Sequence, residues 1–145
     1  MHGSFPIDTK HMRSSVIIGY MNLLMAHLYQ KLNFIHIDND IALVKKIIIY
    51  LTENYTEQIT LKELSDTLKT PHSVISKVFN SATGITIPSF LNWVRASAAV
   101  DLLSSTNLTI TTISFNVGFR TIRNFNRAFL DFYGVTPSMY RNLHK

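Results

Sequence analysis

The chain has 145 residues, 46% of them apolar and 16% charged, with 14 Lys and Arg against 9 Asp and Glu. This length suits one ordinary domain with an appendage, and the apolar fraction excludes a disordered chain. The absence of cysteine excludes disulfides, cysteine-bound metals and cysteine nucleophiles, while the basic excess fits an anionic partner such as nucleic acid or a membrane surface.

The first 38 residues hold one strongly apolar candidate helix, over residues 13–32. Its apolar side chains recur at helical spacing, at Ile17, Met21, Leu24 and Leu28. The apolar run is too short and too interrupted to span a membrane, so we expect no membrane partner. Because the apolar face is wider than a lone helix shows to water, we expect it to pack on the rest of the chain, on a partner or on another domain.

A second helix is expected over residues 40–55, with Asp38 or Asp40 as its N-cap. A strand is the competing interpretation for residues 45–51, because this stretch contains three consecutive β-branched isoleucines. The length of the pattern favours a helix. Its apolar residues recur at Ile41, Val44, Ile48, Leu51 and Tyr55.

Residues 60–84 predict two short helices joined by a tight turn. Thr60 and Glu63 have the spacing of a capping box, which predicts a helix over residues 61–68. Pro71 is best tolerated at the first position of a helix, so Thr70 is the expected N-cap of a helix that ends at Gly84. Two short helices and a tight turn form the helix-turn-helix pattern.

Residues 88–142 predict four more helices, which makes the whole chain all-α. The first is a long helix over residues 88–105, roughly 27 Å in length. Two shorter helices follow at about 110–117 and 121–133, the second ended by Gly134. A last short helix is expected from Pro137 to about residue 142.

Residues 64–84 recur 49 to 50 positions later in the chain, which indicates a duplicated helix-turn-helix unit. Two such units on a long helix can place two recognition helices in successive major-groove segments, about 34 Å apart on one side of a duplex. The matched residues are Leu64 with Ile113, Ser65 with Ser114, Leu68 with Val117, Ile75 with Phe125, Phe79 with Phe129 and Gly84 with Gly134.

Six motifs in this part of the chain are typical of one protein family. They are Ile59-Thr60-Leu61-x-x-Leu64, Phe79-x-x-x-x-Gly84, Phe90-Leu91-x-x-x-Arg95, Ala99-x-x-Leu102-Leu103, Ile113-x-x-x-Val117-Gly118-Phe119 and a final run from Phe125 to Arg141. On these motifs, residues 41–143 resemble the DNA-binding domain of AraC/XylS-type bacterial transcription regulators. The final run, with Gly134-Val135-Thr136-Pro137-Ser138, is the most specific of the six.

The resemblance implies two helix-turn-helix units joined by a linker helix, seven helices in all, with the third and sixth in the major groove. The helix at 13–32 is then an extra N-terminal helix. Full-length members usually carry a separate sensor or dimerisation domain, so we expect a fragment of a longer regulator, with residues 1–38 as the remnant of that domain and residues 39–145 as the DNA-binding domain. Pro71 stands where the family usually has a serine cap. Methyl-transfer repair proteins of the same fold depend on cysteine, which this chain lacks.

In the first unit, Ser73, Ser76 and Lys77 are expected on the exposed face of the recognition helix. The base-reading positions of the family map onto the same three residues, and His72 lies nearby. A serine hydroxyl discriminates poorly between bases, whereas Lys77 can reach a guanine or a phosphate. The alternative is that these are solvated helix residues without a DNA contact.

In the second unit, Arg123, Asn124, Asn126 and Arg127 are the candidate DNA contacts. Arginine suits the O6 and N7 atoms of guanine, and asparagine suits N6 and N7 of adenine. For Arg127, positioning on the DNA backbone is the competing role. Residues 118–145 hold five basic residues and one acidic residue, against three and two in residues 61–82, so we expect more electrostatic affinity from the second unit.

Threonines at helix starts are candidate phosphate contacts, because the free amides there bind anions. They are Thr60, Thr112 and Thr121, for each of which a capping role is the alternative. Arg95, in the linker helix, is expected either to contact a phosphate or to brace the two units.

Together these patterns predict a sequence-specific, double-stranded DNA-binding transcription regulator, an activator by family habit, acting in the cytoplasm with RNA polymerase as a partner. No enzyme activity, metal or cofactor is expected, because the histidines lack ligand spacing and no phosphate loop or nucleophile–base pair occurs. The alternative is a protein-interaction module that uses the 13–32 helix to form a homodimer or to pair with another regulator.

Overall fold

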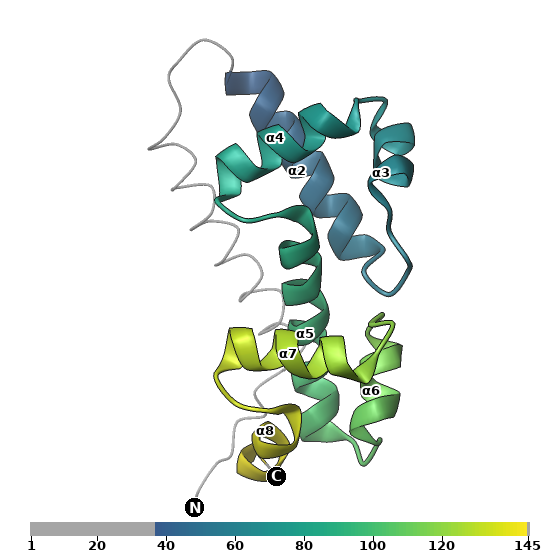
Figure 1. The fold of residues 1–145 in the computed structure, drawn as a ribbon, viewed down its shortest axis with the longest axis vertical. Helices are drawn as coiled ribbons and strands as arrows, with labels where there is room; N and C mark the ends of the chain where they lie inside the picture. The colour runs from purple at the N-terminus through teal and green to yellow at the C-terminus, as the bar shows by residue number, and fades with distance from the viewer. Residues whose placement is uncertain (1–36, 145) are drawn as a thin grey trace, which may run out of the picture. The chain divides into compact units, whose positions relative to one another are not determined.

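The computed structural model describes residues 37–144, where every element of secondary structure is an α-helix (Figure 1). The seven helices are α2 (Ile37–Glu53), α3 (Leu61–Leu68), α4 (His72–Thr83), α5 (Ile87–Ser105), α6 (Ile110–Asn116), α7 (Ile122–Tyr133) and α8 (Pro137–His144). The all-α fold with seven helices is confirmed for this range, whereas the extra helix predicted at 13–32 lies outside the described residues. The chain divides into two compact parts, of which the second comprises Asp38–Lys145. No helix in the described range is long and apolar enough to cross a membrane.

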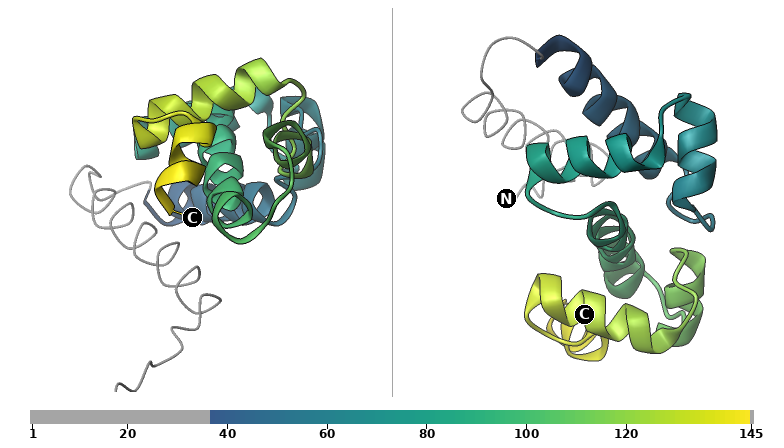
Figure 2. Two further views of the ribbon diagram at one scale, coloured as in Figure 1. Left: turned by 90° about the horizontal axis from the view of Figure 1, so that it is seen from below. Right: turned by 45° about the horizontal axis from the view of Figure 1, so that its top comes forward.

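The linker helix α5 takes part in two hydrophobic cores. Its N-terminal half buries Ile87, Phe90 and Leu91, and the Phe90 ring meets the Phe79 ring of α4 edge-on at 5.6 Å. Around its C-terminal half pack α6, α7 and α8 (Figure 2). This second core consists of Ala96, Ala99, Leu103, Ile113, Val117, Phe119, Phe125, Ala128 and Phe129.

The helices α4 and α7 lie toward opposite ends of α5 and on the same side of it. Each begins beside the short helix of its own pair, α3 or α6, and both run in the same direction (Figures 1 and 2). We call the helix pair α3–α4 the N-terminal helix-turn-helix and the pair α6–α7 the C-terminal helix-turn-helix. The sequence repeat therefore corresponds to a repeated arrangement of helices.

Matched residues of the repeat have matched structural roles. Phe79 and Phe129 are both fully buried. Gly84 and Gly134 both end their helices in the left-handed region, with φ of 75° and 71°, and each donates its N–H to the carbonyl four residues back. Glycine adopts this conformation without the steric cost that a side chain would add.

The turn inside each helix-turn-helix also repeats, but with a different residue at its sharpest point. Lys69 has a φ of 50° and Gly118 a φ of 91°, and both occupy the same place in the repeat. In each turn the following residue donates its N–H to the carbonyl of the matched serine, from Thr70 to Ser65 and from Phe119 to Ser114. The N-terminal turn thus holds a lysine in a conformation that favours glycine.

The capping box at Thr60 is confirmed, whereas the predicted Thr70 cap is wrong. The Thr60 hydroxyl accepts from the Glu63 amide at 3.2 Å, and the Glu63 carboxylate accepts from the Thr60 amide at 2.8 Å. Helix α4 begins one residue later than expected, with Pro71 at the N-cap and no side-chain cap. The Thr70 hydroxyl donates instead to the Leu68 carbonyl at 3.0 Å, which satisfies the end of α3.

The expected aspartate cap of α2 is also wrong, because the helix begins at Ile37. Asp38 and Asp40 therefore lie inside its first turn rather than before it. Residues 45–51 are helical, and the competing strand interpretation is not realised. Three of the residues in this stretch, Ile47, Ile48 and Leu51, are fully or almost fully buried.

Candidate nucleic-acid interface

The N-terminal recognition helix α4 is amphipathic. It buries Ile75, Phe79 and Ala82 and exposes polar residues on its other side. Of the residues predicted to contact DNA, His72, Ser73 and Lys77 are exposed and Ser76 is half-buried. Val74, which was not predicted as a contact, is 42% exposed on the same helix.

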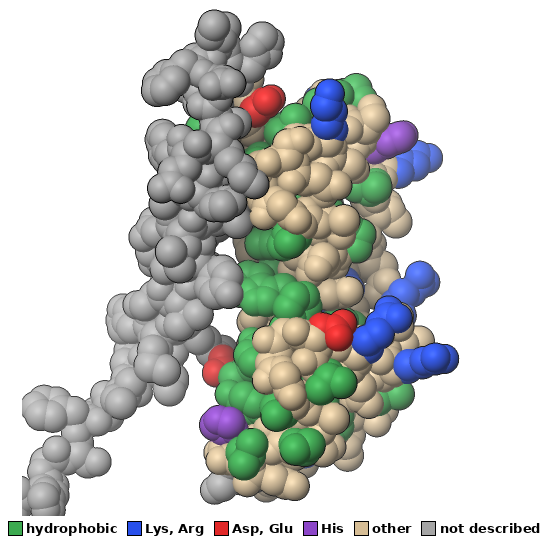
Figure 3. Space-filling view, turned by 60° about the vertical axis from the view of Figure 1, so that its left-hand side comes forward, with side chains coloured by type: hydrophobic (Ala, Val, Ile, Leu, Met, Phe, Trp, Pro, Cys, Tyr) green, Lys and Arg blue, Asp and Glu red, His purple; other side chains and the backbone are tan. Residues whose placement is uncertain are grey.

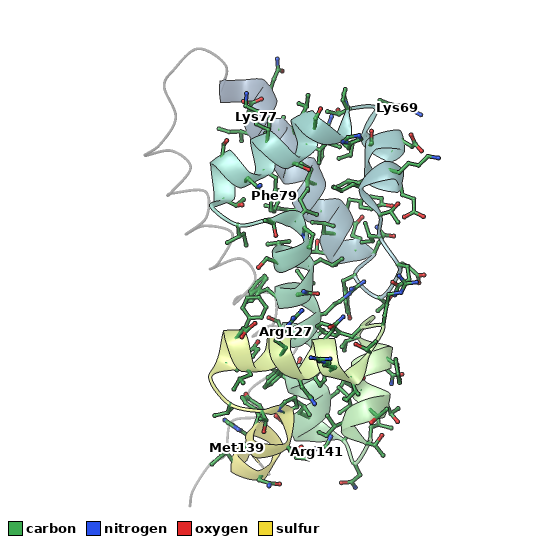
Figure 4. The ribbon with its side chains drawn as sticks, viewed as in Figure 1. Lys69, Lys77, Phe79, Arg127, Met139 and Arg141 are labelled. Atoms are coloured by element: carbon green, nitrogen blue, oxygen red, sulfur yellow. The ribbon has the colours of Figure 1, made fainter. Side chains whose placement is uncertain are left out.

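The C-terminal recognition helix α7 has the same construction with longer polar side chains. It buries Phe125, Ala128 and Phe129. All the predicted contacts on this helix are exposed, namely Arg123, Asn124, Asn126 and Arg127. Figure 4 shows Arg127 on α7 and Lys77 at the matched place on α4.

The structure places the two sets of predicted contacts on separate helices that face the same side. The matched positions are Ser73 with Arg123, Ser76 with Asn126 and Lys77 with Arg127. In each pair the side chain on α7 carries more hydrogen-bond donors than its match on α4, since arginine has more donors than serine or lysine, and asparagine has more than serine. The C-terminal helix-turn-helix therefore carries the larger hydrogen-bonding capacity.

Positive side chains gather along one edge of the described surface, mainly at the level of α7 (Figure 3). Arg120, in the turn before α7, is exposed, as are Arg123 and Arg127 on that helix. Arg120 belongs to the basic residues counted in this region, but it was not predicted as a contact. Its position one residue before the N-cap Thr121 is the signal that could have identified it.

The three predicted threonines lie at helix starts, and their hydroxyls take part in capping. Thr60 and Thr121 are the N-caps of α3 and α7. Thr112 lies in the first turn of α6, where its hydroxyl pairs with that of the N-cap Thr109 at 2.8 Å and its amide donates to the same oxygen at 3.0 Å. A phosphate contact by any of the three stays a prediction.

Arg95 is separated from the exposed contacts and is only 7% exposed. Its Nε and Nη2 atoms donate to the main-chain carbonyls of Tyr55 and Glu57, each at 2.7 Å. Burial lowers the pKa of the Arg95 guanidinium below its ordinary value. These contacts fit the bracing role, one of the two that the sequence left open, and a phosphate contact by Arg95 stays a prediction.

Comparison with known proteins identifies the family. Residues 64–143 match the model of a family described as "Helix-turn-helix domain". An uncharacterized HTH-type transcriptional regulator of Escherichia coli, YdiP, is 34% identical over 104 residues, which are 72% of this chain and 34% of that protein. The chain thus spans about a third of the length of this relative.

Solved structures share the fold. A probable AraC family transcriptional regulator from Rhodopseudomonas palustris is 26% identical, with a TM-score of 0.68 over 72% of this chain and 98% of that one. The DNA-binding domain of the global transcriptional factor AdpA, solved in complex with a target DNA, is 21% identical, with a TM-score of 0.63 over 69% and 90% of the two chains. At that identity, the second likeness shows the fold alone.

The fold, with two helix-turn-helix units on one linker helix, agrees with the family match and with these relatives. The proteins of this family are DNA-binding transcription regulators rather than enzymes. The chain belongs to the AraC/XylS family of helix-turn-helix transcription regulators and contains its DNA-binding domain.

Proposed function

We propose that residues 39–145 bind a specific double-stranded DNA site by inserting α4 and α7 into successive segments of the major groove. The observation that carries this proposal is the pair of matched recognition helices, each with a buried aromatic side and an exposed polar side, on the same side of α5. Helices of this kind read base edges from the major groove, which is wide enough to admit them.

In this arrangement the base contacts come from the exposed residues that the sequence singled out. Arg123 and Arg127 have the chemistry for guanine, and Asn124 and Asn126 have the chemistry for adenine. On α4, His72, Ser73, Ser76 and Lys77 offer fewer donors, so the α7 sub-site is the more strictly read of the two. Thr60, Thr112 and Thr121 contribute phosphate contacts at the helix starts where they lie.

The DNA complex of the AdpA domain supports this mode of binding by likeness of fold. By the habit of the family, the protein activates transcription in the bacterial cytoplasm and works with RNA polymerase. Residues 1–38 are then the remnant of a sensor or dimerisation domain, and a homodimer would form through residues 13–32. These last assignments rest on the family and on the sequence pattern, because residues 13–32 lie outside the described range.

Selection of bound duplexes from a random pool tests the proposal. We expect enrichment of a site with two sub-motifs about one helical turn apart, one for each recognition helix. One short motif would contradict base reading by two helices, and a lack of enrichment would contradict sequence-specific binding altogether.

A matched pair of variants assigns each sub-motif to its helix. Asn126→Ala on α7 and Ser76→Ala on α4 change the same position of the repeat. We expect Asn126→Ala to relax the base preference at one position of one sub-motif, and Ser76→Ala to affect the other sub-motif and by less. Loss of preference in the same sub-motif with both variants would contradict the assignment.

A further inference from the structure

The guanidinium of Arg95 lies where three segments of the domain meet. Arg95 itself comes from the middle of α5. Its two hydrogen bonds go to the carbonyls of Tyr55 and Glu57, in the loop between α2 and α3 that leads into the N-terminal helix-turn-helix. Its carbon Cζ lies 5.8 Å from the centre of the Phe119 ring, which belongs to the turn of the C-terminal helix-turn-helix.

The same place holds the closest main-chain approach to a glycine in the described range. A Cβ added to Gly118 would lie 2.6 Å from the Tyr55 oxygen, 2.8 Å from the Thr56 oxygen and 2.9 Å from Nε of Arg95. The side-chain amide of Gln58 also donates to the Gly118 carbonyl at 3.4 Å. The loop of residues 55–58 and the turn of residues 117–119 are therefore packed directly on each other, and we call this contact the Arg95 junction.

The helices of the two helix-turn-helix motifs make little contact with each other directly. Within the described residues, neither α3 nor α4 packs extensively on α6 or α7. Besides the continuous helix α5, the Arg95 junction thus links the two helix-turn-helix motifs. It is also costly to disrupt, because loss of the guanidinium would remove the donor of two part-buried hydrogen bonds.

We propose that the Arg95 junction fixes the position of α4 relative to α7 and so sets the spacing and rotational phase of the two sub-sites on the DNA. This inference rests on the proposed function, since it concerns how the same two helices read one site. Arg95 is here a positioning residue that touches no DNA. A rigid pair of helices has one matching spacing, because each extra base pair moves a sub-site by about 3.4 Å and turns it by roughly 35° around the duplex.

Arg141 supplies a matched control within the C-terminal helix-turn-helix region. It also donates to two main-chain carbonyls, from Nε to Leu103 at 3.4 Å and from Nη2 to Leu108 at 2.7 Å. Those contacts join α8 to the end of α5 and the loop before α6, and they do not reach the N-terminal unit. Arg141→Lys therefore weakens a similar brace without touching the junction, whereas Arg95→Lys keeps the charge but loses the two-pronged donor.

The first arm of the test needs no DNA. The chain has no cysteine, so two introduced cysteines would be the only sites for spin labels. Ser81→Cys on α4 and Asp131→Cys on α7 serve this purpose, because both positions are exposed and they match in the repeat. We expect a narrow distance distribution between the labels in the parent protein and in Arg141→Lys, and a broadened or shifted one in Arg95→Lys. An unchanged distribution in a folded Arg95→Lys protein would overturn the inference.

The second arm measures affinity for the selected duplex and for versions with one base pair inserted or removed between the sub-motifs. We expect the parent and Arg141→Lys to lose about tenfold or more on the altered spacings, a loss on the scale of a mismatched base pair. Arg95→Lys should bind the original duplex more weakly but lose only about threefold on the altered ones. An equal spacing penalty in both variants would overturn the inference.

A second variant covers the case in which Arg95→Lys does not fold. Phe119→Leu removes the ring beside the guanidinium while keeping an apolar side chain in the core, and it should relax the spacing penalty in the same direction. A folded Phe119→Leu protein with the parent's penalty and label distances would count against the inference. If the parent enriches no duplex, the proposed function fails, and the label distances still decide whether the junction fixes the helices.

Discussion

Lys69 and Gly118 occupy the same place in the repeat, yet only one of them suits the backbone there. Lys69 is the one non-glycine residue with positive φ in the described range, at 50°. A side chain in this region costs on the order of 1 kcal/mol relative to glycine. Lys69→Gly should therefore raise the free energy of unfolding by about 0.5–1 kcal/mol, which urea denaturation would measure.

Gly84→Ala is the reciprocal control for this prediction. Gly84 has a φ of 75° and no atom within 4 Å of an added Cβ, so the substitution introduces backbone strain without a clash. It should lower the free energy of unfolding by about 1 kcal/mol. A destabilised Lys69→Gly protein would mean that the lysine side chain contributes more than its backbone strain removes.

Alanine substitutions at Gly118 and at Gly134 distinguish the cost of backbone strain from the cost of a steric clash. Both have positive φ, but only an alanine at 118 would clash, with the Tyr55 and Thr56 carbonyls and with Arg95, while one at 134 would meet nothing within 4 Å. We expect Gly134→Ala to cost about 1 kcal/mol and Gly118→Ala at least about 2 kcal/mol more, measured by thermal or urea unfolding. Equal losses would show that the loop at residues 55–58 is free to move away.

At the scale of the element, the capping box of α3 makes part of the stability depend on pH. The amide and hydroxyl of Thr60 both donate to the Glu63 carboxylate, and these bonds lower the pKa of Glu63 from its ordinary value of 4.5. A lowered pKa in the folded state means that the charged carboxylate stabilises the fold above pH 4.5, and that this contribution is lost as the pH falls through the lowered pKa.

Glu63→Gln tests this dependence, because glutamine keeps the shape and loses the charge. The parent should be more stable than Glu63→Gln above about pH 5, and the difference should shrink steadily as the solution is acidified below that value. Urea midpoints taken across this range would measure it. In a Thr60→Val background the hydroxyl is lost but the backbone amide still donates to Glu63, so the pH-dependent difference should shrink only in part, and an unchanged difference there would contradict the contribution of the hydroxyl.

The elements were predictable from the sequence where local chemistry decides them. Thr60 with Glu63 and the two helix-ending glycines act over a few residues, so their patterns indicated the starts and ends of helices almost to the residue. The cap at Thr70 failed because its hydroxyl has two possible partners, and the end of α3 takes it. That competition depends on how the turn closes, which spacing alone does not encode.

The exposure of the candidate DNA contacts was predictable to a similar depth. The exposed faces of α4 and α7 follow from helical periodicity, so Ser73, Lys77, Arg123 and Arg127 could be named in advance. The role of Arg95 could not be decided, because its two acceptors lie 40 and 38 residues away in the chain. Contacts at such separation arise from the packing of elements and leave no local pattern.

At the scale of the whole molecule, charge is divided unequally between the N-terminal and the C-terminal helix-turn-helix. The C-terminal unit exposes Arg120, Arg123 and Arg127, with Asp131 as the nearby exposed acid. The N-terminal unit exposes Lys62, Lys69 and Lys77, but two exposed acids, Glu63 and Asp66, lie on α3 beside them. The potential at the DNA-facing side should therefore be more positive near α7 than near α4.

This inequality predicts different salt dependences for two triple variants that remove the same charge. One replaces Arg120, Arg123 and Arg127 by glutamine, and the other replaces Lys62, Lys69 and Lys77. Each cation on a phosphate contributes nearly one unit to the slope of log affinity against log salt, so the arginine triple should reduce the slope by about 2–3 and the lysine triple by about 1. Fluorescence anisotropy with the selected duplex, over a series of potassium chloride concentrations, gives both slopes. Equal reductions would mean that both units grip the backbone alike, and that the difference between α4 and α7 lies only in how they read bases.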